Sequence, residues 1–327
     1  MQRPSAMASA TYEHDTHGRS AERPRDIPKA GWKDILWRLK GKVGEDRLSI
    51  IAAGVAFYGL LSIFPALTAL VALYGLAFNP DQVTQQVEAL RGLLPAQAVQ
   101  LLAGELRDLT QTDQAALGIG VAGGIVVALW SASSAVKTLM EALNVAYDER
   151  EKRGFFKLTA LALALTLGLI VATIAAIALV VVLPAVIGFL GLGMLAQVAR
   201  WAVWPVVAAL AWVGIAVMYR YGPSRDEPQW QWLSWGAGLA LFLWLIGSAL
   251  FSWYVTSFGN YNKTYGSMAA VVILLMWFLL SAYAVLIGAE VNAEIERQTR
   301  KDTTVGKRQP LGERGAHAAD TVGPAHS

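Results

Sequence analysis

Two pairs of charged residues, each spaced four apart in apolar sequence, are the residues of this chain best placed to carry chemistry. Lys137 and Glu141 form one pair, and Glu290 and Glu294 form the other. Residues four apart share one face of a helix, and ionisable groups at membrane depth are functional candidates by default. We expect Glu290 to face a cavity and to bind a cation, a proton or a basic partner such as Lys137. The alternative is ordinary interfacial pairing or snorkelling at helix ends.

Three further residues complete this predicted polar cleft. Tyr58 and Asn144 are expected to be its hydrogen-bonding neighbours, and Pro65 to supply a hinge or to widen it. A proline inside a helix removes one backbone hydrogen bond and usually kinks the helix. Ser62 could instead bond the backbone group that Pro65 frees, which would be a structural role.

Motifs for metal, phosphate or thiol chemistry are missing from the sequence. It has no cysteine and no HExxH, CxxC or GxxxxGK[ST] pattern. The four histidines all lie near the chain ends, at His14, His17, His317 and His326. We therefore predict no metal, no cofactor and no enzymatic activity. The net charge of +3 is too small to indicate a nucleic-acid partner.

Long apolar stretches dominate the composition. The chain is 55% hydrophobic and only 16% charged, whereas a soluble domain carries about 25% charged residues. A helix of about 20 apolar residues crosses a bilayer, and six stretches reach that length. They cover roughly Leu48–Leu76, Ala115–Val136, Phe156–Val182, Ala199–Tyr221, Trp232–Thr256 and Gly266–Ala289. The predicted fold class is all-α, a polytopic membrane protein with six transmembrane helices.

The distribution of lysine and arginine predicts the orientation of these spans. Cytoplasmic loops are enriched in basic residues. Of the 27 lysines and arginines, all but four fall on one side when six spans alternate. The four exceptions are Arg91, Arg107, Arg200 and Lys263. We therefore expect both termini in the cytoplasm and the Glu290 cleft to open on that side.

The polar segments outside the spans suggest four further regions. Residues 1–28 and 299–327 are predicted to be disordered cytoplasmic tails, because they lack apolar periodicity. Residues 29–47 form a basic amphipathic segment that either lies on the membrane face or simply leads into the 48–298 transmembrane domain. Residues 80–114 carry two apolar stripes of helical spacing. They predict short amphipathic periplasmic helices that cap the bundle or lie on the membrane.

Four motifs in fixed order resemble the YihY/BrkB family of bacterial inner-membrane proteins. The likeness covers about residues 30–298. The motifs are AAGVAFYGLLSIFP at 52–65, LWSASSAVKTLMEALNVAYDER at 129–150, the YNKTYGS turn at 261–267 and LLMWFLLSAYAVLIGAEVNAE at 274–294.

This resemblance implies a multi-pass protein of the bacterial inner membrane. The family is named for a virulence factor linked to serum resistance, and an older label calls it ribonuclease BN. Transport and envelope-lipid roles have been suggested for it. Because no residue pattern supports a nuclease, we expect a permease-like or envelope-lipid-handling protein whose partners are membrane lipids and a small solute or lipid substrate.

The alternative function is a non-transporting scaffold for envelope assembly or partner proteins. The two hypotheses differ in the interior that they require. A cavity reaching the middle of the membrane with Glu290 on its wall would favour transport. A sealed interior of small apolar side chains would favour the scaffold.

Overall fold

The computed structural model describes residues 15–77, 114–189, 193–257 and 268–326. Within these ranges the chain is helical and forms no strand beyond one isolated bridge between Pro228 and Thr304. The predicted all-α class is therefore confirmed. The predicted amphipathic helices of segment 80–114 and the turn at 261–267 lie outside the described residues, except for Gln114.

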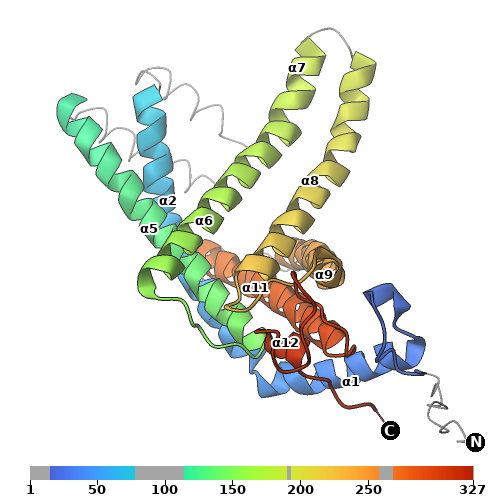
Figure 1. Cartoon of the computed structure of the whole chain (residues 1–327). Coiled ribbons are helices and arrows are strands. Elements are labelled where there is room, and N and C mark those ends of the chain that lie inside the picture. The colour runs from blue at the N-terminus through green and yellow to red at the C-terminus, as the bar shows by residue number, and fades with distance from the viewer. Residues whose placement is uncertain (1–14, 78–113, 190–192, 258–267, 327) are drawn as a thin grey trace, which may run out of the picture.

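Six long helices make up the body of the protein (Figure 1). They are α2 (Leu48–Ala77), α5 (Gln114–Ala146), α6 (Phe155–Ile177), α8 (Gly193–Tyr221), α9 (Trp230–Ser257) and α11 (Met268–Glu296). The shorter elements are η1 (Pro24–Asp26), α1 (Lys29–Glu45) and α12 (His317–Asp320). Among the described residues, five helices are long and apolar enough to cross a membrane, and α1 with α2 adds a sixth if this bent pair is one span.

The third apolar segment runs further than predicted. The predicted span ends at Val182, but α6 continues through one π-helical turn, Ala178–Val182 (η2), into α7 (Leu183–Phe189), which contains Pro184. Proline has no N–H with which to continue the ladder of helical hydrogen bonds. The wider turn immediately before Pro184 changes that ladder, so the helix proceeds instead of stopping.

A sharp bend separates α1 from α2. The two helices meet at 62°. Asp46 closes α1 by donating its N–H to the Lys42 carbonyl, and Arg47 takes the left-handed conformation with φ 49°. That conformation ends a helix. As a result α1 lies across the lower end of α11, while α2 rises beside α5 (Figure 1).

The helices pack in two groups that diverge toward one end. α11 lies against α9 and α2, and α2 also packs along α5. In Figure 1 the upper ends of α2 and α5 lean away from those of α7 and α8. The described buried residues therefore concentrate at the lower end, where α1 lies against α11.

A close backbone contact joins α9 to α11. A Cβ atom added at Gly236 would lie 2.1 Å from the carbonyl oxygen of Gly288, so only glycine fits there. Asn292 strengthens the contact: its Oδ1 accepts the Gly236 N–H at 2.8 Å, and its Nδ2 donates to the Leu233 carbonyl at 3.1 Å. Small residues that allow close backbone approach are typical of membrane helix packing.

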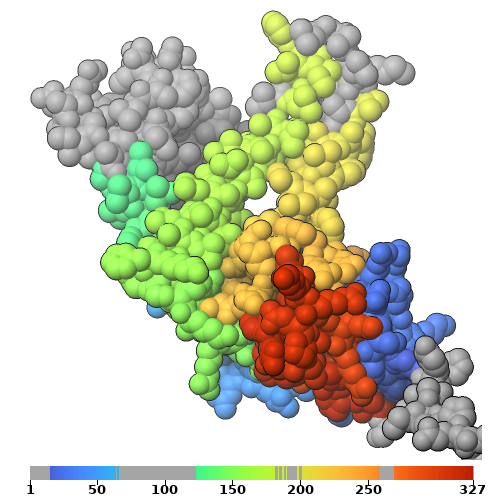
Figure 2. All heavy atoms as spheres, viewed as in Figure 1, coloured from blue at the N-terminus to red at the C-terminus, as the bar shows by residue number. Residues whose placement is uncertain are grey.

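Residues 1–28 and 299–327 were predicted to be disordered tails, and the structure describes residues 15–28 and 299–326 of them as folded. These segments fold over the lower end of the bundle, and Figure 2 shows the C-terminal segment (red) as a compact mass beside the N-terminal one (blue). Ala21 and Ile27 are buried against Ile35 and Ile295. Arg314 is also buried and donates hydrogen bonds to the backbone carbonyls of Arg300, Lys301, Gln309 and Ala319. Backbone hydrogen bonding thus orders a segment whose composition is too polar to predict a core.

The α9–α11 contact gives a stability prediction. Gly236→Ala should lower the melting temperature of the detergent-solubilised protein, because overpacking costs about 1–3 kcal/mol. Gly238→Ala is the matched control on the same helix, since an added Cβ would meet only Trp212 Nε1 at an ordinary 3.8 Å. Equal melting temperatures for the two variants would contradict this packing.

Candidate functional site

A row of polar side chains lies between α1 and α11, and we call it the α1–α11 seam. α1 and its C-cap contribute four residues spaced by four, and α11 and its end contribute three with the same spacing. They are Asp34, Arg38, Lys42 and Asp46 from the first helix and Glu290, Glu294 and Gln298 from the second. Equal spacing places each set on one helix face, so the two sets meet along the whole length of the contact.

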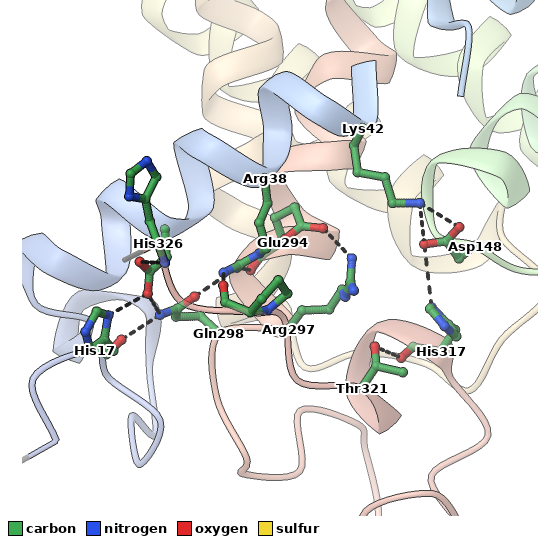
Figure 3. Close-up of polar contacts among 12 residues, drawn as sticks. His17, Arg38, Lys42, Asp148, Glu294, Arg297, Gln298, His317, Thr321 and His326 are labelled. Atoms are coloured by element: carbon green, nitrogen blue, oxygen red, sulfur yellow. Dashed lines mark hydrogen bonds and ion pairs between the residues drawn. The ribbon is translucent and has the colours of Figure 1, made fainter. Parts of the chain in front are cut away.

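Arg38 holds the middle of the seam together (Figure 3). Its guanidinium pairs with the Glu294 carboxylate through Nε, and its Nη2 donates to Gln298 Oε1 at 2.8 Å. Arg297 adds a second cation, with Nη1 2.6 Å from Glu294 Oε1. Both Arg38 and Glu294 are almost fully buried. Buried charges persist in proteins when they are paired and hydrogen-bonded in this way.

Both chain ends contribute to the seam. His17 Nδ1 lies 2.7 Å from Asp34 Oδ2, and the His326 backbone N–H donates to Asp34 Oδ1 at 2.8 Å. Arg38 Nη1 donates to the Pro324 carbonyl at 2.9 Å. Two of the histidines that the sequence placed in disordered tails therefore belong to this site (Figure 3).

Glu290 occupies the seam's end nearest the middle of α11. Its side chain is fully buried, and neither carboxylate oxygen accepts a hydrogen bond from a described residue. The charged groups that act on it are Asp46, Lys42 and Glu294. Lys42 Nζ lies 3.4 Å from Asp46 Oδ2 and 2.8 Å from the Asp148 carboxylate.

The structure does not bring Lys137 and Glu141 to Glu290. Lys137 Nζ lies over the rings of Trp130 and Phe155, 5.1 and 5.4 Å from their centroids, and Glu141 is exposed. This face of α5 is turned toward the start of α6. The basic partner expected from α5 comes instead from α1, as Lys42.

Tyr58 and Asn144 also lie apart from Glu290's charged neighbours. Tyr58 is 47% exposed and packs against Phe57. Asn144 is buried, but its Nδ2 donates to Glu151 Oε2 at 3.1 Å and its Oδ1 accepts the Ser224 N–H at 2.6 Å. Asn144 therefore joins the α5–α6 connection to the α8–α9 connection.

Pro65 lies inside α2, which continues on both sides of it. Proline leaves the carbonyl four residues earlier without its helical partner, and here that residue is Leu61. Ser62 Oγ donates to the Gly59 carbonyl at 2.7 Å, so its hydroxyl is not used for Leu61. A hinge at Pro65 stays a prediction.

A second buried ion pair lies beside the seam. Arg225 Nη2 is 2.6 Å from Glu296 Oε2, and both side chains are fully buried. Thr303 Oγ1 donates to the same carboxylate at 2.8 Å, and the guanidinium lies 5.0 Å from the Tyr147 ring centroid. Burial acts to lower the pKa of Arg225, but the charge and hydrogen bonds of Glu296 outweigh it and raise this pKa. Sequence reasoning missed this pair.

Two pockets flank the site without including Glu290. One is a polar groove of about 540 Å³ beside α1, lined by Trp37, Arg38, Lys40, Gly41, Lys42, Glu45, Glu294, Arg297 and Pro324. The other is an apolar cavity of about 450 Å³ between α6, α8, α9 and α11. Its lining includes Leu169, Ala172, Val207, Ala211, Gly214, Leu241 and Val285.

Comparison with protein families gives one match across most of the chain. The family described as virulence factor BrkB matches residues 39–311. The match includes the seam residues from Lys42 to Gln298 and the apolar cavity, but begins after Asp34 and Arg38. No solved structure matches this chain.

Individual relatives come from several bacteria. A ribonuclease-like protein of Bacillus subtilis, YfkH, is 30% identical over 259 residues, which is 76% of this chain and 90% of the relative. A UPF0761 membrane protein of Vibrio vulnificus is 29% identical over 271 residues, covering 81% and 83% of the two chains. A UPF0761 membrane protein of Histophilus somni is 26% identical over 268 residues, covering 81% and 90%.

The Arg225–Glu296 pair predicts a large effect of single substitution. Arg225→Met should destabilise the protein by about 3–5 kcal/mol, because it strands a buried carboxylate. The double variant Arg225→Met/Glu296→Met should recover most of that loss. Lys152→Met is the control. The Lys152 side chain, which pairs with Glu149, is 62% exposed, so the loss of this ion pair should cost less than about 1 kcal/mol of stability. A double variant no more stable than the single one would contradict the pairing.

Glu151 gives a pH prediction. Hydrogen bonds from Arg153 lower the pKa of this carboxyl from 4.5 to about 2, against the opposing effect of burial. A lowered carboxyl pKa stabilises the fold above the unfolded value, and that stabilisation is lost as pH falls from 4.5 toward 2. Glu151→Gln should flatten the dependence of melting temperature on pH in this window. The exposed Glu141→Gln is the control, and equal slopes for wild type and Glu151→Gln would refute the assignment.

Proposed function

The chain belongs to the virulence factor BrkB family of membrane proteins, and we propose that it handles envelope lipids in the bacterial inner membrane. In this proposal six helices cross the bilayer, and both termini lie in the cytoplasm. A lipid acyl chain enters the apolar cavity sideways between α6 and α8. The cavity is the observation that carries the proposal.

The cavity has the size and composition of an acyl-chain site. Its volume of about 450 Å³ lies within the range of roughly 300–1,000 Å³ that is typical of ligand pockets. Leucine, alanine, valine and isoleucine make up most of its wall. Two residues of its wall on α6, Leu169 and Ile177, are exposed at the surface of the protein, and Figure 2 shows α6 and α8 (green and yellow) as neighbouring columns. This arrangement supports entry from the bilayer.

Polar atoms in the cavity wall already have hydrogen-bond partners. Thr173 Oγ1 donates to the Leu169 carbonyl at 2.8 Å. Trp244 Nε1 donates to Ser281 Oγ at 3.0 Å, and that hydroxyl donates to the Trp277 carbonyl at 2.8 Å. A polar solute would lose its hydration here without recovering hydrogen bonds, which is costly. The wall therefore favours a lipid chain over a sugar or an amino acid.

The charged residues support the same reading. Solute transport was expected to show as a cavity with Glu290 on its wall, whereas Glu290 lines neither pocket described above. Of the other carboxylates of the seam, Glu294 is paired with Arg38 and Arg297, Asp34 with His17, and Asp46 lies 3.4 Å from Lys42. Among the described residues, no three His, Cys, Asp or Glu side chains converge as a metal site would require. The proposed function therefore includes no ribonuclease activity.

The bias of basic residues supports the proposed orientation. α1 and the seam carry many of the chain's lysines and arginines at the end where both described terminal segments fold. Basic segments remain on the cytoplasmic side of bacterial membranes. The apolar cavity then lies within the bilayer, and the polar groove beside α1 lies at its inner face.

Filling the cavity should block lipid handling. Protein reconstituted into vesicles should accelerate the transbilayer movement of a headgroup-labelled phospholipid, followed by chemical quenching of the outer-leaflet label. Gly214→Leu should reduce that acceleration about tenfold or more, because Gly214 lines the cavity and has open space at its Cβ position.

Gly168→Leu is the matched control for this experiment. Gly168 also has open space at its Cβ position, but it is exposed on α6 and does not line the cavity. Its variant should retain wild-type acceleration. Wild-type protein that leaves lipid movement unchanged would refute the proposal and favour a non-transporting scaffold.

A further inference from the structure

Glu290 differs from the other buried glutamates of α11. Glu294 is met by Arg38 and Arg297, and Glu296 is met by Arg225. Glu290 is equally buried, yet no described residue donates a hydrogen bond to either of its oxygens. An ionised carboxylate in that position would lose its hydration without compensation.

A third unmatched oxygen belongs to Asp46. Asp46 Oδ2 is also buried and receives no hydrogen bond from a described residue, although Lys42 Nζ lies 3.4 Å away. Asp34 meets Gln298 and Arg38 meets Glu294, so the four-residue spacing brings Asp46 and Glu290 opposite each other at the other end of the seam. Two adjacent carboxyl groups thus face each other at its inner end.

Lys42 interacts with three carboxylates in this region. Lys42 lies 2.8 Å from Asp148 as well as 3.4 Å from Asp46, and it also acts on Glu290. Asp148 is 33% exposed, so water shares in its stabilisation. The charged and titratable groups around Glu290 are Lys42 and Asp46 of α1, Tyr147 and Asp148 at the end of α5, Glu294 of α11 and His317, which lies 3.7 Å from Asp148. Negative charge is in excess.

We propose that Glu290 and Asp46 share one proton, taken up from water, and that they form a buried protonation site. Two carboxylates that share a site do not both ionise readily. A protonated carboxyl is a donor, so an O–H of Glu290 can donate to Asp46 and satisfy both unmatched groups. The inference goes beyond the proposed lipid handling, because it requires no bound lipid.

The location gives this proton a structural consequence. Asp46 immediately precedes Arg47, at the 62° bend between α1 and α2. The shared proton therefore ties α11 to that bend. Its loss would leave two facing carboxylates that repel each other across the seam.

Infrared spectroscopy of the full-length protein in vesicles tests this inference. At neutral pH the wild type should show a carboxylic-acid C=O band that shifts in heavy water. Glu290→Gln should lose this band, and Asp46→Asn should lose it too, because Glu290 then faces Lys42 without a competing carboxylate. The exposed Glu141→Gln is the control and should retain the band.

Two results would overturn the inference. One is a wild-type spectrum without the band, or with a band that survives both Glu290→Gln and Asp46→Asn. The other is a band that appears only when sodium is replaced by choline, since sodium would then occupy the site. Because the wild-type spectrum alone can refute the proposal, it remains testable even if Glu290→Gln fails to fold.

Discussion

Charge burial between α1 and α11 is the constraint on which the lower end of this protein depends. Arg38 and Glu294 are almost entirely removed from solvent, and an unpaired charge in such surroundings costs several kcal/mol. The helix that carries Arg38 therefore has to lie across α11. The terminal segments must also cover the row, since Pro324 and His326 complete the hydrogen bonds of Arg38 and Asp34.

This constraint separates the two ends of the bundle. At the seam, ion pairs, the Gly236–Gly288 contact and the folded terminal segments bring the helices together. Away from it, α2 and α5 lean away from α7 and α8 (Figure 1). Between helices in lipid no hydrophobic driving force closes such a gap. The apolar cavity between α6, α8, α9 and α11 is the site that we propose for an acyl chain.

Hydropathy was sufficient to predict the long helices, because membrane-spanning segments must satisfy their own backbone hydrogen bonds. The apolar sequence around Glu290 also identified this residue as a functional candidate. Lys137 was one expected partner of Glu290, but it lies over Trp130 and Phe155. Helix spacing gives the face on which a residue lies, but not which neighbouring helix that face meets. The matching four-residue spacing of Asp34, Arg38 and Lys42 was visible in the sequence and could have identified α1 as the partner of α11.

The folded tails were not predictable from composition. Their order rests on single side chains such as Arg314, which bonds four backbone carbonyls, and such contacts leave no periodic pattern. His17 was likewise hidden, because its partner Asp34 is distant in sequence.

Photo-crosslinking with a phospholipid that carries a diazirine in its acyl chain tests the proposed lipid site most directly. After illumination in membranes and peptide mapping, the account predicts labelling of the cavity wall at Ala172, Val207 and Ala211, in addition to the exposed face of α6 at Ile170. Labelling confined to exposed faces such as Ile170, with none on the cavity wall, would contradict it.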